Sequence, residues 1–310
     1  MMDTASPIAD VLQPANALKP AEVRRVFAVV NAKSGSTDAT SPERLRKILA
    51  DRGIEADIAA PEPEGMADAI TAAVSQAPDV LIVLGGDGTA RSAAEIAGPN
   101  GPPLILLPGG TMNVLPKALY GELAWPEALE AALDRGELRD LPGAKASDHL
   151  FFVAGIFGSP ALMAPARELM REGKVGKALT RARIAFRKAF GHRLRARRDE
   201  SPMTKTEAVA VLCPLISKVD GAKLETALLD PSDTLAAFRL GVGALTGGWR
   251  KDPNADFRVC TTTEIYGRHD VPAVLDGETI SLPSPVRITT LPRAARVIAL
   301  EDVGELGAGN

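Results

Sequence analysis

The stretch 84–89, Leu-Gly-Gly-Asp-Gly-Thr, constrains the fold of this chain more than any other part of the sequence. An apolar run, 80–84, leads into it, and a stretch of small residues suited to a helix, 90–97, follows it. An unbroken run of Val, Ile and Leu is typical of a strand that is buried on both faces. The sequence therefore predicts a strand, a tight glycine turn and a helix in succession.

This succession is suited to phosphate binding. Glycines let the backbone turn sharply and approach a ligand closely, and the helix that follows offers unpaired N–H groups. The turn is not a Walker A loop, because it lacks the Gly-Lys-Thr/Ser ending and its charged residue, Asp87, is acidic. An aspartate beside phosphates needs a cation between them, so Asp87 indicates a magnesium-bound nucleotide. Thr89 can cap the helix or bond a phosphate oxygen. A plain tight turn in an α/β domain is the alternative interpretation.

Two further glycine turns follow apolar runs. The run 25–30 leads into Asn-Ala-Lys-Ser-Gly-Ser at 31–36, and the run 103–107 leads into Pro-Gly-Gly-Thr-Met-Asn at 108–113. Ligands of open α/β sheets lie at the carboxyl ends of the strands. We therefore expect the three turns to converge on one site.

The segments between these turns alternate between helix and strand. Ser41 and Pro42 predict a helix N-terminus, with Ser41 as the N-cap, and Gly53 predicts its end. A strand is predicted at 54–60, and helices at 64–76 and 125–135. Alternating strands and helices predict a mostly parallel sheet that is covered on both faces.

The pattern changes after 141–143, Leu-Pro-Gly, where short strand candidates replace the alternation. These lie at 149–157, 206–212, 224–229, 257–263, 271–275 and 286–290, with a helix at 235–246. A last strand, 296–300, is expected to return to the first domain. We therefore predict an α/β domain at 23–143 with 291–304, a β-rich, sandwich-like domain at 144–290, and poorly ordered tails at 1–22 and 305–310.

Composition limits the functional class. A chain of 310 residues with 45% apolar and 24% charged residues suits two globular domains. Cys213 and Cys260 have no metal-like spacing, so we expect reduced thiols and a cytoplasmic protein. The N-terminus does not read as a signal peptide, and no apolar run is long enough to cross a bilayer.

A basic segment, 167–198, contrasts with the net charge of −3, because it carries twelve basic and two acidic residues. It is predicted to be helical from 165 to 190. One interpretation is binding to an anionic membrane surface; the other is a solvated helix face that packs on the second domain. Nucleic acid is not expected as a partner, because the remainder of the chain is acidic and aromatic residues are few.

Four motifs together resemble the catalytic domain of the diacylglycerol kinase family, bacterial lipid kinases related to sphingosine and ceramide kinases. Gly-Gly-Asp-Gly-Thr at 85–89 is similar to the family's nucleotide signature, and 108–113 to its Pro-x-Gly-Thr-x-Asn turn. Asn-Ala-Lys-Ser-Gly at 31–35 resembles its first loop, and Asp-Gly-Glu at 276–278 resembles a motif of its second domain. The resemblance covers 25–300. It implies a nucleotide domain, a sandwich-like lipid domain and an active site in the cleft between them.

The resemblance implies a membrane-peripheral lipid kinase that uses ATP and Mg²⁺ to phosphorylate a lipid alcohol such as diacylglycerol. Glu278 is then the candidate general base, Asp87 a magnesium ligand, and Asp276 either orients Glu278 or shares the magnesium. Without the resemblance, Asp276 and Gly277 favour a plain hairpin turn. The nucleotide would be held by Asn31, Ser34, Gly35, Gly85, Gly86, Asp87, Gly88, Thr89, Gly109, Gly110, Thr111 and Asn113.

Two alternatives stay open at this stage. The Gly-Gly-Asp-Gly element also occurs in NAD kinases, although 108–113 and 276–278 argue against that activity. A nucleotide- or lipid-binding regulator without turnover is the second alternative. It is suggested by departures from the family pattern at Ala32, Arg91, Val114 and Pro116. The sequence identifies neither the lipid nor the oligomeric state.

Overall fold

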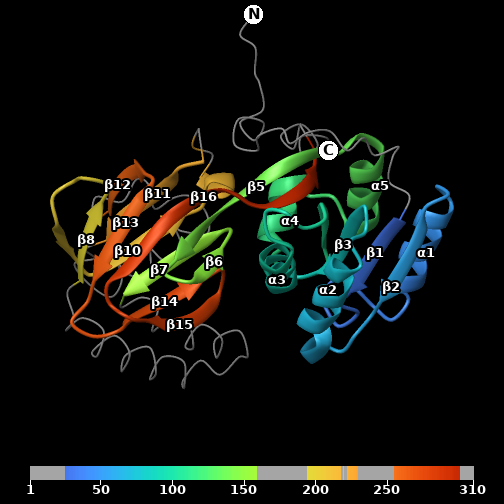
Figure 1. Cartoon of the computed structure of the whole chain (residues 1–310), viewed down its shortest axis with the longest axis horizontal. Helices are drawn as coiled ribbons and strands as arrows, with labels where there is room; N and C mark the ends of the chain where they lie inside the picture. The colour runs from blue at the N-terminus through green and yellow to red at the C-terminus, as the bar shows by residue number, and fades with distance from the viewer. Residues whose placement is uncertain (1–24, 159–193, 218, 220–221, 230–254, 301–310) are drawn as a thin grey trace, which may run out of the picture. The chain divides into compact units, whose positions relative to one another are not determined.

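The computed structural model describes residues 25–158, 194–217, 219, 222–229 and 255–300 (Figure 1). The chain divides into two compact units. The first comprises residues 1–143, 220–222 and 291–310, and the second comprises 144–219 and 223–290. The predicted fold class is confirmed, because the first unit holds a parallel sheet with helices and the second is rich in antiparallel strands.

The sheet of the first unit has the strand order β2–β1–β3–β4, and all of these pairs are parallel. The strands are β1 (Arg25–Val30), β2 (Glu55–Ala59), β3 (Val80–Gly85) and β4 (Leu104–Pro108). Every residue of β3 and β4 is buried, as the unbroken apolar runs predict. β1 lies beside β3 with Val30 opposite Leu84, so these two strands end side by side (Figure 1).

Helices connect these strands. They are α1 (Ser41–Ala50), a 3-10 turn η2 (Pro63–Gly65), α2 (Met66–Ser75), α3 (Asp87–Ala97), α4 (Val114–Tyr120) and α5 (Trp125–Arg135). The chain leaves β1 toward β2 but leaves β3 in the opposite direction, toward β4. With right-handed crossovers, α1 and α3 cover opposite faces. The order therefore reverses between β1 and β3, and such a switch point is where α/β sheets bind ligands.

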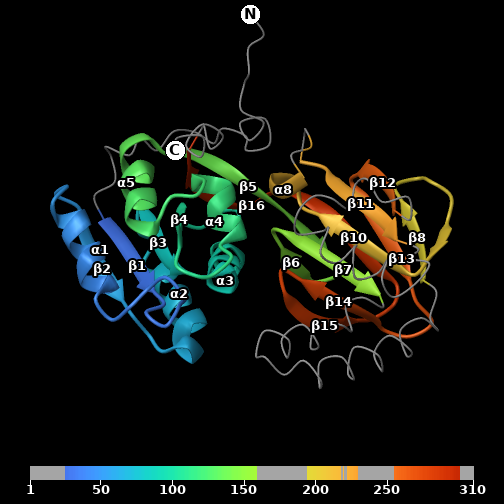
Figure 2. The same cartoon turned by 180° about the vertical axis from the view of Figure 1, so that it is seen from behind.

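The second unit is a sandwich of antiparallel strands. One six-stranded sheet has the order β12–β11–β10–β7–β14–β15. Facing it are β8, β9, β13, the start of β16, the end of β5, and β6. Apolar side chains from both layers, such as Phe157 and Ile265, form one buried core. Figure 2 shows the hairpin of β14 and β15 beside β7.

The elements of this second half have the following bounds: β5 (Glu137–Ala146), β6 (His149–Phe151), β7 (Ala154–Gly158), β8 (Leu194–Arg198), β9 (Thr204–Thr206), β10 (Ala208–Leu212), α8 (Pro214–Ser217), β11 (Leu224–Leu229), β12 (Ala255–Cys260), β13 (Thr262–Tyr266), β14 (Val271–Leu275), β15 (Glu278–Leu282) and β16 (Val286–Ala299). β16 pairs with β13 near its start, and its Val297 pairs with Leu104 of β4.

Several boundaries differ from the sequence-based expectation. The predicted strand 149–157 is two strands, broken at 152–153, and 257–263 is divided at Thr261 between two sheets. The predicted strands 286–290 and 296–300 are one continuous strand, β16. Apolar patterning cannot show which sheet a strand joins, because both layers of a sandwich present the same alternation.

Other elements escaped the sequence analysis. β5 runs through Pro142 and Gly143 and so crosses the point where the two compact units divide, between Gly143 and Ala144. β8 contains three arginines, and β15 begins with Glu278. Ser41 is the first residue of α1, not its N-cap, which is Thr40.

Some expectations fall outside the described residues. These are the predicted helices at 165–190 and 235–246 and the tails at 1–22 and 305–310. Among the helices that the structure describes, none has the length and apolar character required to cross a bilayer.

Candidate active site

The three glycine turns of the first unit contact one another through their backbones. Gly109 donates its N–H to the carbonyl of Gly85 at 2.8 Å, and Ser36 donates its N–H to the carbonyl of Gly109 at 2.7 Å. A Cβ added to Gly110 would lie 2.6 Å from the Cα of Gly86, closer than such atoms approach in proteins. The turns after β1, β3 and β4 therefore converge, as the sequence analysis predicted, and glycine at 110 is a packing requirement.

The turn after β3 presents the N-terminus of α3. The N-cap of α3 is Gly86, and its first backbone bond runs from the N–H of Ala90 to the carbonyl of Gly86 at 3.0 Å. The N–H groups of Asp87, Gly88 and Thr89 consequently have no acceptor within the helix. Gly88 is exposed, and a Cβ at this position would meet no atom within 4 Å. This end of α3 is open to a ligand.

Three hydroxyl side chains belong to the turns and to the first turn of α3. A Cβ added to Gly86 would lie 3.5 Å from Ser34 Oγ, and one added to Gly35 would lie 3.0 Å from Thr111 Oγ1. Thr89 lies in the first turn of α3, where its side chain packs against Gly85. It is not the N-cap, so the capping interpretation of Thr89 is wrong.

Asp87 joins two of the turns through its carboxylate. Its Oδ1 accepts the backbone N–H of Leu115 at 3.0 Å, in the first turn of α4. Asp87 Oδ2 accepts no hydrogen bond from the described part of the chain. The carboxylate is partly exposed beside the open end of α3, so it could contact a cation bound to phosphate.

Two asparagines hold the turns in shape. Asn113 is buried in the left-handed conformation, with φ of 52°; its Oδ1 accepts the N–H of Gly110 at 2.7 Å, and its Nδ2 donates to the carbonyl of Gly110 at 2.8 Å. The carbonyl of Asn31 accepts the Thr37 hydroxyl at 2.6 Å, and Asn31 Oδ1 accepts the N–H of Lys33 at 3.2 Å. Both asparagines therefore help to hold the shape of the turns, and their predicted contact with the nucleotide stays a prediction.

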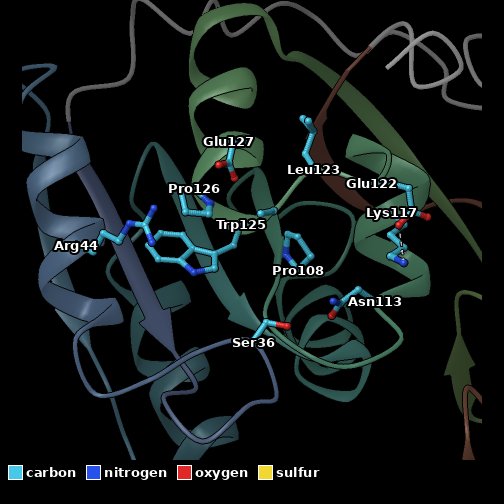
Figure 3. A pocket seen from close by; sticks show the side chains of 11 residues that line it. Ser36, Arg44, Pro108, Asn113, Lys117, Glu122, Leu123, Trp125, Pro126 and Glu127 are labelled. Atoms are coloured by element: carbon cyan, nitrogen blue, oxygen red, sulfur yellow. Dashed lines mark ion pairs between the residues drawn. The ribbon is translucent and has the colours of Figure 1, made fainter. Parts of the chain in front are cut away.

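A pocket of about 440 Å³ adjoins the turns on the side of α1 and α5 (Figure 3). Figure 3 shows Trp125 between Arg44 and Pro108, and the Arg44 guanidinium lies 5.2 Å from the centroid of the Trp125 ring. Lys117 also lines it and pairs with Glu122 at 2.7 Å. The sequence analysis missed Arg44, Lys117 and Trp125, because they come from three separate helices and form no motif.

Asp276 and Glu278 lie in the second unit. Asp276 and Gly277 form the two-residue turn between β14 and β15, with φ of 48° and 91°, so the expectation of a hairpin is confirmed. The carboxylate of Asp276 accepts the N–H groups of Phe152, Val153 and Ala154. Glu278 is exposed at the start of β15, opposite Leu275.

The described end of the basic segment is used in the fold. Arg197 pairs with Glu264 at 2.5 Å, and the buried Arg198 pairs with Asp256. These arginines belong to β8, and only Arg195 of this strand is exposed. The remaining basic residues, up to Arg193, lie outside the described residues.

The described residues contain no group of three or more histidine, cysteine or acidic side chains that could hold a metal ion.

Residues 25–142 match the family model of the diacylglycerol kinase catalytic domain. The match contains all three glycine turns, so the resemblance predicted from their motifs is confirmed for this part of the chain.

Two solved structures from Bacillus anthracis str. Sterne extend the likeness to the second unit. One is described as a diacylglycerol kinase; it is 21% identical, with a TM-score of 0.66, and the alignment covers 90% of this chain and 98% of that one. The other is provisionally described in the same way, with 20% identity, a TM-score of 0.67 and the same coverage. At this identity, the likeness shows a shared fold.

Proposed function

We propose that this protein is a lipid kinase, which transfers the γ-phosphate of ATP to the hydroxyl of a lipid such as diacylglycerol. One observation carries the proposal: the three glycine turns meet at the open N-terminus of α3, within the segment that matches the diacylglycerol kinase catalytic domain. Backbone N–H groups at a helix N-terminus suit the phosphates of a nucleotide.

Phosphoryl transfer requires positioning and charge stabilisation more than covalent chemistry from the protein. The N–H groups of Asp87, Gly88 and Thr89 and the hydroxyls of Ser34 and Thr111 would hold the triphosphate. Asp87 Oδ2 would hold the magnesium, which neutralises charge on the phosphates. The lipid oxygen forms a bond to the γ-phosphorus, the bond from that phosphorus to the bridging oxygen breaks, and ADP leaves.

The proton of the lipid hydroxyl needs an acceptor as the new bond forms. Glu278 is the proposed acceptor, because it is an exposed carboxylate next to Asp276, whose two carboxylate oxygens already accept backbone N–H groups. We also propose that the lipid binds to the second unit and that the basic segment, at residues 167–193, binds the membrane surface.

The test is a phosphorylation assay with radiolabelled ATP and a total lipid extract, followed by identification of the labelled product. NAD serves as the competing acceptor in a parallel reaction. Labelled phospholipid with unlabelled NAD supports the proposal. Labelled NAD would replace it with NAD kinase activity, and ATP binding without any lipid-dependent turnover would replace it with a regulatory role.

A further inference from the structure

Asp276, in the hairpin between β14 and β15, forms four hydrogen bonds with one backbone segment, 152–154. Asp276 Oδ2 accepts the N–H of Phe152 at 2.7 Å, and Oδ1 accepts the N–H groups of Val153 and Ala154, each at 2.9 Å. Asp276 returns its own N–H to the carbonyl of Ala154 at 2.9 Å. Three consecutive N–H groups thus converge on a single carboxylate.

Cys213 also forms hydrogen bonds with this part of the chain, at 151–154. The Cys213 N–H donates to the carbonyl of Val153 at 3.0 Å, and its Sγ donates to the carbonyl of Phe151 at 3.4 Å. Burial, with a smaller contribution from the charge of Asp276, raises the pKa of the Cys213 thiol well above its usual range. The thiol therefore keeps the proton that it donates.

Packing fixes the hairpin at the same point. Gly155, which follows the held segment, pairs with Leu275, and a Cβ added to Gly155 would lie 2.8 Å from the Phe157 ring and 3.1 Å from Leu275. Leu275 is buried and lies directly opposite Glu278 across the hairpin. Opposed residues of an antiparallel pair project from the same face of a sheet, so the position of Leu275 also fixes that of Glu278.

We propose that Asp276 is a positioning residue for Glu278: its carboxylate clamps the β14–β15 hairpin to segment 151–154 and thereby sets where the Glu278 carboxylate stands. This inference rests on the proposed function, in which Glu278 accepts the proton. The sequence analysis left two roles open for Asp276, orienting Glu278 or sharing the magnesium, and the clamp favours the first. A carboxylate that accepts three backbone N–H groups has much of its acceptor capacity already in use.

Replacing Asp276 with Asn separates the two roles. The amide keeps one acceptor oxygen but turns an N–H₂ donor toward at least one backbone N–H, so part of the clamp must open. If Asp276 positions Glu278, Asp276→Asn lowers kcat by about tenfold or more, and the magnesium concentration for half-maximal rate stays within about twofold of the parent value.

Asp199 provides a matched control. It also has a positive φ, 45°, and its Oδ1 accepts the N–H groups of Thr261 and Thr262 together with the Thr261 hydroxyl. Asp199→Asn thus replaces a carboxylate that accepts a similar set of hydrogen bonds. Asp199 lies in the same unit but not in the β14–β15 hairpin. We expect it to lower the melting temperature by an amount similar to Asp276→Asn and to leave kcat unchanged.

Hydrogen exchange measured by mass spectrometry reports on the clamp without any substrate. Asp276→Asn should speed amide exchange in peptides that contain 152–154, and Asp199→Asn should not. If excess magnesium restores kcat in Asp276→Asn, the inference is overturned and Asp276 is a metal ligand. If Asp199→Asn loses kcat to the same extent, the inference is overturned and the effect is one of general stability.

The two proposals fail in different ways. Unchanged exchange at 152–154 in Asp276→Asn overturns the clamp itself, whatever the parent protein catalyses. If the parent protein phosphorylates no lipid, the proposed function is refuted. The positioning role of Asp276 is then refuted too, even if the exchange experiment shows that the clamp exists.

Discussion

The carboxylate of Asp87, at the start of α3, accepts the backbone N–H of Leu115 in the first turn of α4, with 3.0 Å between Oδ1 and N. One side chain therefore connects the turn after β3 to the helix that follows the turn after β4. Asp87 has two separable tasks: it caps α4 with one oxygen and can contact a cation with the other.

Two substitutions separate these tasks. Asp87→Asn keeps an oxygen that can accept the Leu115 N–H, so it should fold with nearly the parent stability while the rate falls about 10² to 10⁴-fold, because the magnesium ligand is lost. Asp87→Ala should also lose about 1 kcal/mol of unfolding free energy, because the cap of α4 is removed. Denaturant unfolding and the lipid phosphorylation assay measure the two effects. Near-normal turnover of a folded Asp87→Asn protein would contradict the magnesium role.

Gly88 tests whether phosphate approaches the N-terminus of α3. An added Cβ meets no atom within 4 Å, and alanine is favoured over glycine in helices, so Gly88→Ala should fold at least as well as the parent. The methyl group would nevertheless stand at the exposed end of α3, where the ligand is expected. Calorimetry should show weaker ATP binding. An unchanged affinity would place the phosphates elsewhere.

Gly110 serves as the contrasting case. The family resemblance includes Gly110 among the residues that hold the nucleotide, and a Cβ at this position would lie 2.6 Å from the Gly86 Cα. Gly110→Val should therefore lose stability and ATP affinity together, because it separates the two turns. Preserved stability with lost affinity would instead indicate direct contact with the ligand.

Asn113 should act through the shape of its turn. Asn113→Ala removes both side-chain bonds to Gly110. The Gly110 carbonyl keeps the Ser36 hydroxyl as a donor, but the Gly110 N–H loses its acceptor, which costs about 1 to 3 kcal/mol of unfolding free energy. We expect ATP affinity to fall as a consequence, because the turn that follows β4 loses its shape. Denaturant unfolding and calorimetry on the same preparation check both. Full stability of Asn113→Ala would show that the turn does not depend on these bonds.

Glu278→Gln preserves size and removes the proton acceptor. It should lower kcat strongly and leave ATP affinity almost unchanged, because Glu278 belongs to the second unit and not to the glycine turns. Glu200→Gln, at another exposed glutamate of that unit, is the control and should behave as the parent. If Glu278→Gln keeps most of its kcat between about pH 6 and 9, the base is another group.

The basic segment is expected to support binding to anionic membranes. Replacing Arg181, Arg183, Arg187 and Lys188 with Gln should reduce sedimentation with anionic vesicles, since each charge contributes about 1 kcal/mol near such a surface. Neutral vesicles are the control, and salt should weaken the binding of the parent. Equal sedimentation of parent and variant would favour a solvated helix face.

The sequence by itself determined the glycine turns and the parallel sheet that carries them. Apolar runs such as 80–84 strongly favour a buried strand, and the glycine-rich residues after them favour a tight turn. Both signals are local in the chain, so they could be interpreted without knowledge of distant contacts. The convergence of the turns followed from a general rule of parallel sheets.

The tertiary structure decided which side chains serve the framework and which remain available to a ligand. The bonds from Asp87 to Leu115 and from Asp276 to 152–154 join residues whose partners no motif identifies. The last of these spans more than a hundred positions of sequence, between Asp276 and Phe152. A sequence motif does not show whether its carboxylate accepts three backbone N–H groups or binds a metal ion. The role of the carboxylate depends on which groups the fold places within hydrogen-bonding distance of it, about 3 Å, and the sequence does not show those groups.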